Sequence, residues 1–261
     1  MADAAMILHA IEAGQGGPPL VLLHGLFGSA RNFGSVQRGF AQHRRTIALD
    51  LRNHGASLHD SDMRYATMAA DVLQTLDALG ALPAVLLGHS MGGKAAMQAA
   101  LVQPDAVARL IVADIAPVPY PPHLRPTAEA MASLPLASRM TRAAADAALA
   151  DAVPDAGMRA FLLQNLQLGD APAWRIGLAE IIAAFADIEA WDVGDHARYT
   201  KPTLFIAGAT SNYIEAAHRS VIRALFPNAR FVTLKNAGHW LHAENPTGFA
   251  AVVEAFLTAA S

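Results

Sequence analysis

The sequence predicts an α/β fold in which helices cover both faces of a mostly parallel sheet. Short apolar segments alternate with segments whose apolar residues recur at helical spacing. Polar residues such as Asp50 and Ser90 directly follow apolar segments, at the strand ends where such sheets carry functional groups. The alternation stops after Pro117 and resumes after Pro202, which indicates one insertion in an otherwise continuous α/β domain.

The first part of the chain supplies five expected strands. Residues 6–13 alternate loosely and indicate an edge strand, and a turn cluster follows them at 14–19. Further strands are expected at 20–23, 45–49, 84–87 and 110–113, and helices at 32–42, 67–79 and 94–103. Gly80 follows the second of these helices, where a glycine commonly ends a helix.

Residues 117–199 interrupt this pattern. Prolines at positions 117, 119, 121 and 122 mark the break, and helices are expected at 127–133, 142–153, 157–167 and 174–191. The alternation then returns, with strands expected at 203–207 and 230–234 and helices at 215–226 and 247–259. We therefore expect a core domain of residues 1–116 and 200–261, with residues 117–199 inserted as a helical lid.

Composition limits the classes of protein that the chain can be. Its 261 residues are 53% hydrophobic and 16% charged, which suits a large buried core, and its net charge of −3 favours neither nucleic acid nor an anionic membrane as a partner. The absence of cysteine excludes disulfides and thiolate chemistry. With no secretory signal and no uninterrupted apolar run of membrane-spanning length, we expect a cytoplasmic protein without a membrane span.

The most informative segment is Gly88-His89-Ser90-Met91-Gly92, a G-x-S-x-G motif between an expected strand and an expected helix. A serine on such a sharp turn is held in a strained backbone conformation that lifts its hydroxyl clear of the sheet. Side chains two residues to either side would collide there, so positions 88 and 92 are glycine. Ser90 is therefore the candidate nucleophile.

Two other interpretations of this segment remain open at this point. Gly88 to Lys94 also fits the start of a phosphate-binding loop, although Ala95 lacks the hydroxyl that would bind Mg²⁺. A lone G-x-S-x-G also fits a glycine-rich turn with no chemistry. The rest of the chain has to decide between them.

A nucleophilic serine needs a general base, and the base needs an acid that orients it. Ser90, Asp114 and His239 occur in a chain order typical of such sites, and each follows an expected strand. His239 is the preferred base because it lies in the loop after the last strand. We interpret His242 as structural, and we expect no metal because no third ligand accompanies these two histidines.

The oxyanion of an acyl-transfer reaction needs two backbone donors. Met91 N–H is one candidate, because it lies at a helix N-terminus, and Leu26 N–H in the loop after the second strand is the other. His24 is expected to brace that loop, and Arg52 and His54 to hold the loop that follows Asp50.

Apolar residues of the insertion pack it onto the core, or line a pocket for an acyl group on its underside. As substrate-binding residues we expect Trp174, Ile182 and Phe185 from the insertion and Phe27 and Trp240 from the core loops. The same apolar surface would also suit a second subunit, so a homodimer is a possible assembly.

Five segments of the chain resemble the α/β-hydrolase superfamily, and most closely the YbfF-like bacterial esterases. They are HGLFGS at 24–29, DLRNHG at 50–55, GHSMGGKA at 88–95, DIAPV at 114–118 and AGHWLHAE at 237–244. The resemblance implies about eight strands, a helical lid after the sixth strand, no cofactor, and hydrolysis of acyl esters of small molecules. It also implies that thioesters such as acyl-CoA are possible substrates.

The sequence departs from the commoner superfamily pattern at the acid. That acid usually follows the strand at 203–207, but residues 208–214 contain no carboxylate. The resembling group shares this absence and carries an aspartate at the position of Asp114, which we therefore assign as the acid. Glu215, Asp187 and Asp192 are the alternatives.

Together these features predict a serine hydrolase that cleaves carboxylic esters through an acyl-enzyme. An acyl-CoA thioesterase or a carbon–carbon bond hydrolase on the same fold is the alternative activity. A hydrolase-fold protein that binds a ligand without turning it over is the alternative from another class. The complete set of Ser90, Asp114 and His239 argues against it, because a binding protein does not need an activated serine.

Overall fold

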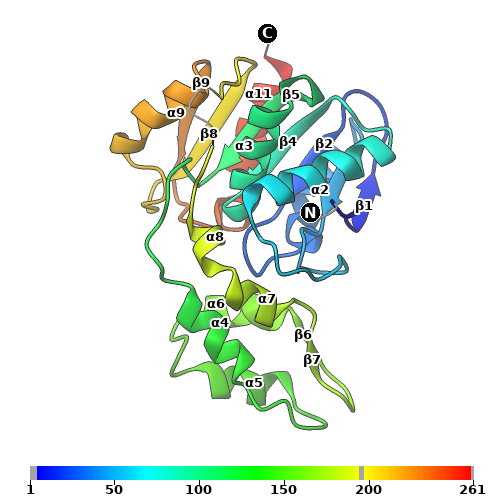
Figure 1. Cartoon of the computed structure of the whole chain (residues 1–261), viewed down its shortest axis with the longest axis vertical. Helices are drawn as coiled ribbons and strands as arrows, with labels where there is room; N and C mark the ends of the chain where they lie inside the picture. The colour runs from blue at the N-terminus through cyan, green and yellow to red at the C-terminus, as the bar shows by residue number, and fades with distance from the viewer. Residues whose placement is uncertain (1–4, 194–196, 260–261) are drawn as a thin grey trace.

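A seven-stranded sheet forms the centre of the computed structural model, which describes residues 5–193 and 197–259 (Figure 1). The strands lie in the order β1-β3-β2-β4-β5-β8-β9, and only β1 runs antiparallel to its neighbour. Their bounds are Ala10–Ala13 (β1), Leu20–Leu23 (β2), Thr46–Leu49 (β3), Ala84–His89 (β4), Val107–Ala113 (β5), Thr203–Gly208 (β8) and Ala229–Leu234 (β9). The predicted α/β architecture is confirmed.

Both faces of this sheet are covered by helices, because its central strands are apolar on both sides. Val21 and Leu23 point into one core with the helices α2, α3 and α9, whereas Leu20 and Leu22 point into the other with α1 and α11. The helices are Gly34–Phe40 (α1), Tyr65–Ala78 (α2), Met91–Val102 (α3), Arg219–Leu225 (α9) and Pro246–Thr258 (α11). A short helix, Leu241–Glu244 (α10), precedes α11.

The strand count corrects one expectation. The described residues form seven main-sheet strands, not about eight, and the insertion follows the fifth strand, β5, not the sixth. The segment before β1 stays outside the sheet because side chains of α2 take its N–H groups. Met6 N–H donates to Asp71 Oδ1 and Leu8 N–H to Thr75 Oγ1, at 2.8 and 2.9 Å.

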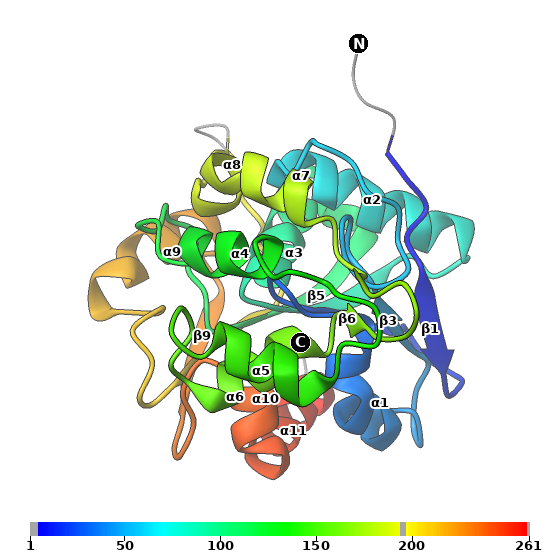
Figure 2. The same cartoon turned by 90° about the horizontal axis from the view of Figure 1, so that it is seen from below.

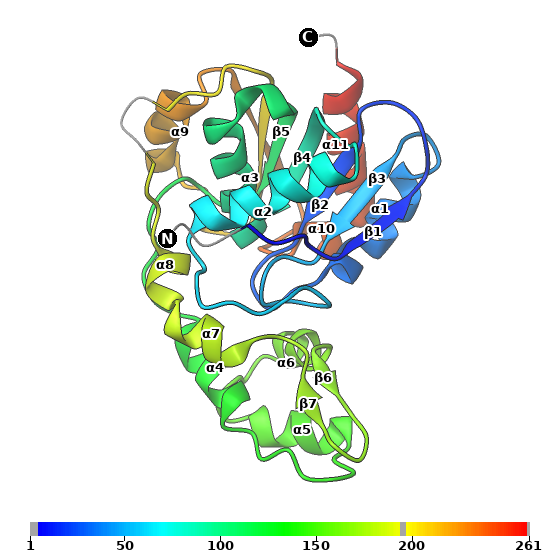
Figure 3. The ribbon, with the colours of Figure 1, turned by 45° about the vertical axis from the view of Figure 1, so that its right-hand side comes forward.

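The inserted segment lies beyond the carboxyl ends of the parallel strands (Figures 1 and 3). It contains five helices in its described part: Arg125–Ala132 (α4), Arg142–Leu149 (α5), Ala156–Leu163 (α6), Leu178–Ala183 (α7) and Phe185–Glu189 (α8). The prediction of helices through 157–167 and from 174 onward is wrong in part. Leu166–Gln167 (β6) and Ala173–Trp174 (β7) pair instead as a small antiparallel hairpin. Gly169 has a φ of +136°, which lets the chain reverse there.

The inserted segment has a small core of its own. Apolar side chains from the loop after α4 and from α5, α6 and β6 gather there, namely Leu134, Ala145, Leu149, Leu163 and Leu166. Its outgoing and returning ends meet where Tyr120 N–H donates to Glu189 O at 2.9 Å. Figure 2, seen from below, shows α4, α5 and α6 across this end of the molecule.

Candidate active site

Ser90 occupies the sharp turn between β4 and α3. Its φ of 53° and ψ of −122° lie in a region that a residue with a side chain rarely adopts. A Cβ on Gly88 would lie 2.1 Å from Gly92 O, and a Cβ on Gly92 would lie 2.3 Å from Leu23 O. The collision expected from the sequence is therefore the physical reason for both glycines.

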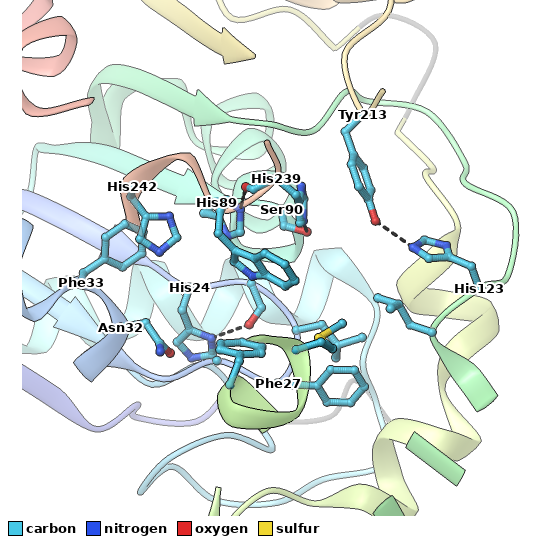
Figure 4. Close-up of a pocket in the computed structure, with 17 residues that line it drawn as sticks. His24, Phe27, Asn32, Phe33, His89, Ser90, His123, Tyr213, His239 and His242 are labelled. Atoms are coloured by element: carbon cyan, nitrogen blue, oxygen red, sulfur yellow. Dashed lines mark hydrogen bonds between the residues drawn. The ribbon is translucent and has the colours of Figure 1, made fainter. Parts of the chain in front are cut away.

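A continuous hydrogen-bonded chain runs from Ser90 to Asp114. The Ser90 hydroxyl lies 3.1 Å from His239 Nε2, and His239 Nδ1 lies 2.8 Å from Asp114 Oδ2. Figure 4 shows Ser90 and His239 facing each other on the cavity wall. The three side chains follow β4, β9 and β5 respectively, so the loops at the carboxyl-end edge of one sheet bring them together.

Asp114 is fully buried and has three donors. Gly208 N–H donates to Oδ1 at 2.9 Å, while His239 Nδ1 and the Ser211 hydroxyl both meet Oδ2. Hydrogen bonds of this kind stabilise the charged form of a buried carboxylate. Ser211 was not predicted from the sequence, because a serine in a loop gives no signal of its own.

The alternative acids do not reach His239. Glu215, Asp187 and Asp192 are all exposed, and none of them shares a hydrogen bond with His239 in the described part of the chain. Glu215 instead accepts from the backbone of His218 at the start of a short 3₁₀ helix.

Tyr213 packs against one face of the His239 ring. The two rings stack with centroids 4.0 Å apart, and the Tyr213 hydroxyl lies 2.8 Å from His123 Nε2 (Figure 4). Burial raises the pKa of Tyr213 to about 12, so its hydroxyl stays protonated as a donor. Neither Tyr213 nor His123 was predicted, since their proximity to His239 arises only from the tertiary fold.

His89 and His242 support His239 from behind. His89 Nε2–H donates to His239 O at 2.7 Å, and burial lowers the pKa of His89 well below its usual value. His242 packs against Phe33, and burial lowers its pKa to about 4. Both rings are therefore neutral at neutral pH, and His242 lies in the apolar packing as expected of a structural residue.

Two buried histidines fix the loop that carries Leu26. His24 Nδ1–H donates to Gly25 O, and its Nε2 accepts from Leu51 N–H. His54 Nε2 in turn accepts from Phe27 N–H at 3.1 Å, and burial lowers the pKa of His54 to about 3. Both rings are neutral at neutral pH, so each can accept a backbone N–H.

The N–H groups of Leu26 and Met91 have no acceptor among the described residues. Met91 is the first residue of α3, where the helix dipole favours an anion. Arg52 braces the neighbouring loop from below, because its guanidinium donates twice to the buried carboxylate of Asp71, at 2.7 and 3.0 Å.

Two cavities meet at Ser90. The main cavity, about 240 Å³, is lined by Phe27, Trp240 and His239 together with Met158 and Phe161 of the insertion. The side cavity, about 50 Å³, lies between Met91 and Phe185. Three of the expected substrate-binding residues, Phe27, Trp240 and Phe185, therefore line one of the two cavities.

The other two expected substrate-binding residues line neither of these cavities. Trp174 lies in β7, where its indole N–H donates to Met131 O at 3.0 Å, and Ile182 packs against the core. Met158 and Phe161 take their place in the main cavity. An apolar helical stripe does not reveal which of its residues face a cavity, so the sequence alone could not separate these two pairs.

Comparison with known proteins decides the family. A family model described as the alpha/beta hydrolase fold matches residues 18–246. The chain belongs to the α/β-hydrolase family. This α/β-hydrolase is 42% identical over 249 residues to the sn-1-specific diacylglycerol lipase ABHD11 of Mus musculus. The aligned region covers 92% of this chain and 81% of that relative.

Two further relatives of this α/β-hydrolase agree with the resemblance. The esterase YbfF of Escherichia coli strain K12 is 36% identical over 245 residues, or 92% of each chain. The solved structure of a marine microorganism esterase superposes with a TM-score of 0.93 at 33% identity, over 97% of this chain and 100% of that one. The chain is thus an α/β-hydrolase of the esterase and lipase type, and its resemblance to the YbfF-like group is confirmed.

Neither a metal site nor a membrane span is found in the part of this α/β-hydrolase that the structure describes. Within residues 5–193 and 197–259, no three His, Asp or Glu side chains gather where they would hold a metal ion. None of the helices in those ranges is both long and apolar enough to cross a bilayer.

Proposed function

We propose that this α/β-hydrolase cleaves carboxylic esters, with Ser90 as nucleophile, His239 as general base and Asp114 as the orienting acid. The observation that carries the proposal is the hydrogen-bonded chain Ser90–His239–Asp114, with 3.1 and 2.8 Å between successive side-chain atoms. The strained backbone of Ser90 supports it, because strain of this kind concentrates at functional residues.

In the proposed reaction, His239 Nε2 takes the Ser90 proton while Oγ attacks the substrate carbonyl carbon. The resulting oxyanion accepts hydrogen bonds from the Leu26 and Met91 N–H groups. His239 then protonates the leaving alcohol, and the C–O bond of the ester breaks. A water molecule activated by His239 attacks the acyl-enzyme, and the acid leaves as Ser90 regains its proton.

We propose that residues 117–199 act as a lid and residues 1–116 and 200–261 as the core domain. Met158 and Phe161 of the insertion form part of the main cavity wall, and the Phe161 and Trp240 rings lie 5.8 Å apart across it. Asn165 also ties the insertion to the core, since its side-chain amide donates to Phe27 O at 2.7 Å.

The preferred substrate class is an ester of a small molecule with an apolar part. Apolar and aromatic side chains dominate the main cavity, and its volume of about 240 Å³ suits a group of modest size. The mouse relative is named a diacylglycerol lipase and the bacterial one an esterase, so acylglycerols belong in the test panel. A thioester would react by the same steps, because its carbonyl needs the same nucleophile and the same oxyanion donors.

The proposal is tested with p-nitrophenyl acetate, butyrate, octanoate and palmitate, a diacylglycerol and palmitoyl-CoA. We expect wild type to hydrolyse at least one ester and Ser90→Ala to lose about 10⁴-fold or more in kcat. Equal turnover by both proteins would overturn the assignment of Ser90. If neither protein turns over any substrate and a fluorophosphonate does not label Ser90, the protein binds a ligand without catalysis.

A further inference from the structure

Lys94 is a buried lysine that the proposed mechanism does not use. It lies in the first turn of α3 and is only 1% exposed. Its ammonium donates to Ala190 O at 2.8 Å and to Glu189 O at 3.3 Å, at the C-terminal end of α8. The Tyr65 and Tyr120 rings flank it, with 5.2 and 5.1 Å from Nζ to their centroids.

These contacts also remove the phosphate-binding alternative for this segment. A lysine of that motif reaches toward the glycine-rich loop and its bound phosphates. The Lys94 ammonium points instead to carbonyl groups of the inserted segment, and Ser90 bonds to His239.

The side cavity separates Ser90 from this ammonium. Ser90, Met91 and Lys94 all line it, together with Glu189. Ser90 immediately precedes α3, and Lys94 lies in the first turn of that helix, where its N–H donates to Ser90 O at 3.1 Å. The side cavity has a volume of about 50 Å³, which leaves room for only a few non-hydrogen atoms between the serine and the lysine.

The Lys94 end of the side cavity has unused hydrogen-bonding capacity. A lysine ammonium has three N–H groups, and within the described ranges two acceptors contact that of Lys94. Glu189 Oε1 is also buried, and it has no hydrogen-bond partner among the described residues. Burial lowers the pKa of Lys94 to about 7, which reflects how costly an ammonium is at this depth. Leaving a buried acceptor without a partner is also unfavourable, so binding of a ligand that pairs with both groups in this cavity would be favoured.

The position of His239 indicates whether the acyl or the alcohol part of an ester faces the Lys94 end of the side cavity. The leaving oxygen must receive its proton from His239, which lines the main cavity but not the side cavity. The alcohol part therefore extends into the main cavity. The acyl part extends into the side cavity, past Met91 toward Lys94.

We propose that Lys94 and Glu189 form a hydroxyl-binding subsite for the acyl group, so that the enzyme prefers short hydroxyacyl esters. The hydroxyl group accepts from the third Lys94 N–H and donates to Glu189 Oε1. This inference rests on the proposed function, because it takes Ser90 as the attachment point of the acyl group.

The test compares ethyl 3-hydroxybutyrate, as both enantiomers, with ethyl butyrate, which differs only by lacking the hydroxyl. Initial rates are followed by acid release for wild type, Lys94→Met and Glu189→Met, the second of which removes the side-chain acceptor. Because a hydrogen bond to a charged group is among the stronger ones in proteins, we expect wild type to favour one hydroxy enantiomer by about 10-fold or more in kcat/KM. Both variants should lower that ratio toward one. Lys235→Met, on an exposed lysine, should leave it unchanged.

A purely structural role for Lys94 predicts a different result, because it would lower the rates of both esters together and keep their ratio. A wild-type ratio near one, or a ratio that survives in both variants, would overturn the inference. Glu189→Met removes the side-chain acceptor but keeps the backbone carbonyls that hold Lys94, so it tests the subsite even if Lys94→Met does not fold.

Calorimetry separates this inference from the proposed function. Ser90→Ala protein, which cannot form an acyl-enzyme, is titrated with the same esters. Tighter binding of the hydroxy ester supports the subsite whether or not wild type turns the esters over. Equal binding of the two esters contradicts the subsite even if wild type is an active esterase.

Discussion

Asp114→Asn is the substitution that tests the site most directly. Asn Oδ1 can still accept from Gly208 N–H, which places the amide NH₂ where Oδ2 now receives donors from both His239 and Ser211. An NH₂ group cannot accept, so His239 must turn its unprotonated nitrogen toward it and carry the proton on Nε2. Nε2 is then unable to accept the proton of Ser90.

The size of this effect follows from the loss of the base. Forcing the wrong tautomer on the histidine of a serine hydrolase costs about 10⁴ in kcat, or about 5 kcal/mol of transition-state stabilisation. We expect that loss for p-nitrophenyl butyrate at pH 7.5, together with much slower labelling of Ser90 by a fluorophosphonate. Ser211→Ala removes one donor but keeps the tautomer, so it should cost only about 10-fold.

Glu215→Gln is the matched control, because Glu215 is exposed and does not contact His239. It should retain wild-type kcat to within about twofold. Thermal unfolding of each variant verifies that the fold is intact. An Asp114→Asn enzyme that is folded and keeps more than a tenth of wild-type kcat would refute the assignment of the acid.

Three further results are expected. His54→Ala leaves Phe27 N–H without its acceptor and should lower kcat for p-nitrophenyl butyrate about 10-fold by loosening the loop that carries Leu26. Because burial lowers the pKa of His54 to about 3, the unfolded chain binds more protons than the native protein between pH 6.5 and that value. The free energy of unfolding in urea should therefore fall as pH falls through this window, and His54→Ala should reduce the slope. Arg52→Met leaves the Asp71 carboxylate buried without its partner and should lower the free energy of unfolding by about 3–5 kcal/mol.

Each of these results has a contrary outcome. The Arg64 side chain is 63% exposed where it pairs with Asp62, so Arg64→Met should cost less than about 1 kcal/mol. A similar loss for Arg52→Met and Arg64→Met would show that burial of the Arg52 pair is irrelevant. An unchanged kcat for His54→Ala would exclude a role for His54 in holding the loop that carries Leu26. An unchanged pH dependence of the free energy of unfolding would exclude its contribution to stability at acid pH.

The sequence predicts most of the core because local and tertiary requirements coincide there. The segment from Ala84 to Gly92 is apolar where both faces of β4 are buried, and it carries glycine where a Cβ would touch backbone atoms. Ser90, His239 and Asp114 could be selected because strand ends of a parallel sheet meet at one edge. The choice of Asp114 over Glu215 needed the resemblance to a known group, since spacing alone allows both.

The inserted segment is where prediction from sequence loses resolution. The β6–β7 hairpin lies in a region whose apolar spacing also fits a helix, and only its pairing distinguishes the two structures. Tyr213 and Lys94 escaped assignment for a related reason. Their roles depend on contacts with residues far away in the chain, His239 for the tyrosine and Glu189 for the lysine.

The hydrogen bond between Tyr120 N–H and Glu189 O makes the intervening segment an exchangeable module. A segment whose two ends meet can be replaced by another of different length at little entropic cost, because loop closure depends only weakly on length. Asp114 lies outside this junction, and its carboxylate is anchored to Gly208 of the neighbouring strand. Grafting a new segment between positions 120 and 189 would therefore change the walls of the main cavity while leaving the hydrogen-bonded chain to Ser90 in place.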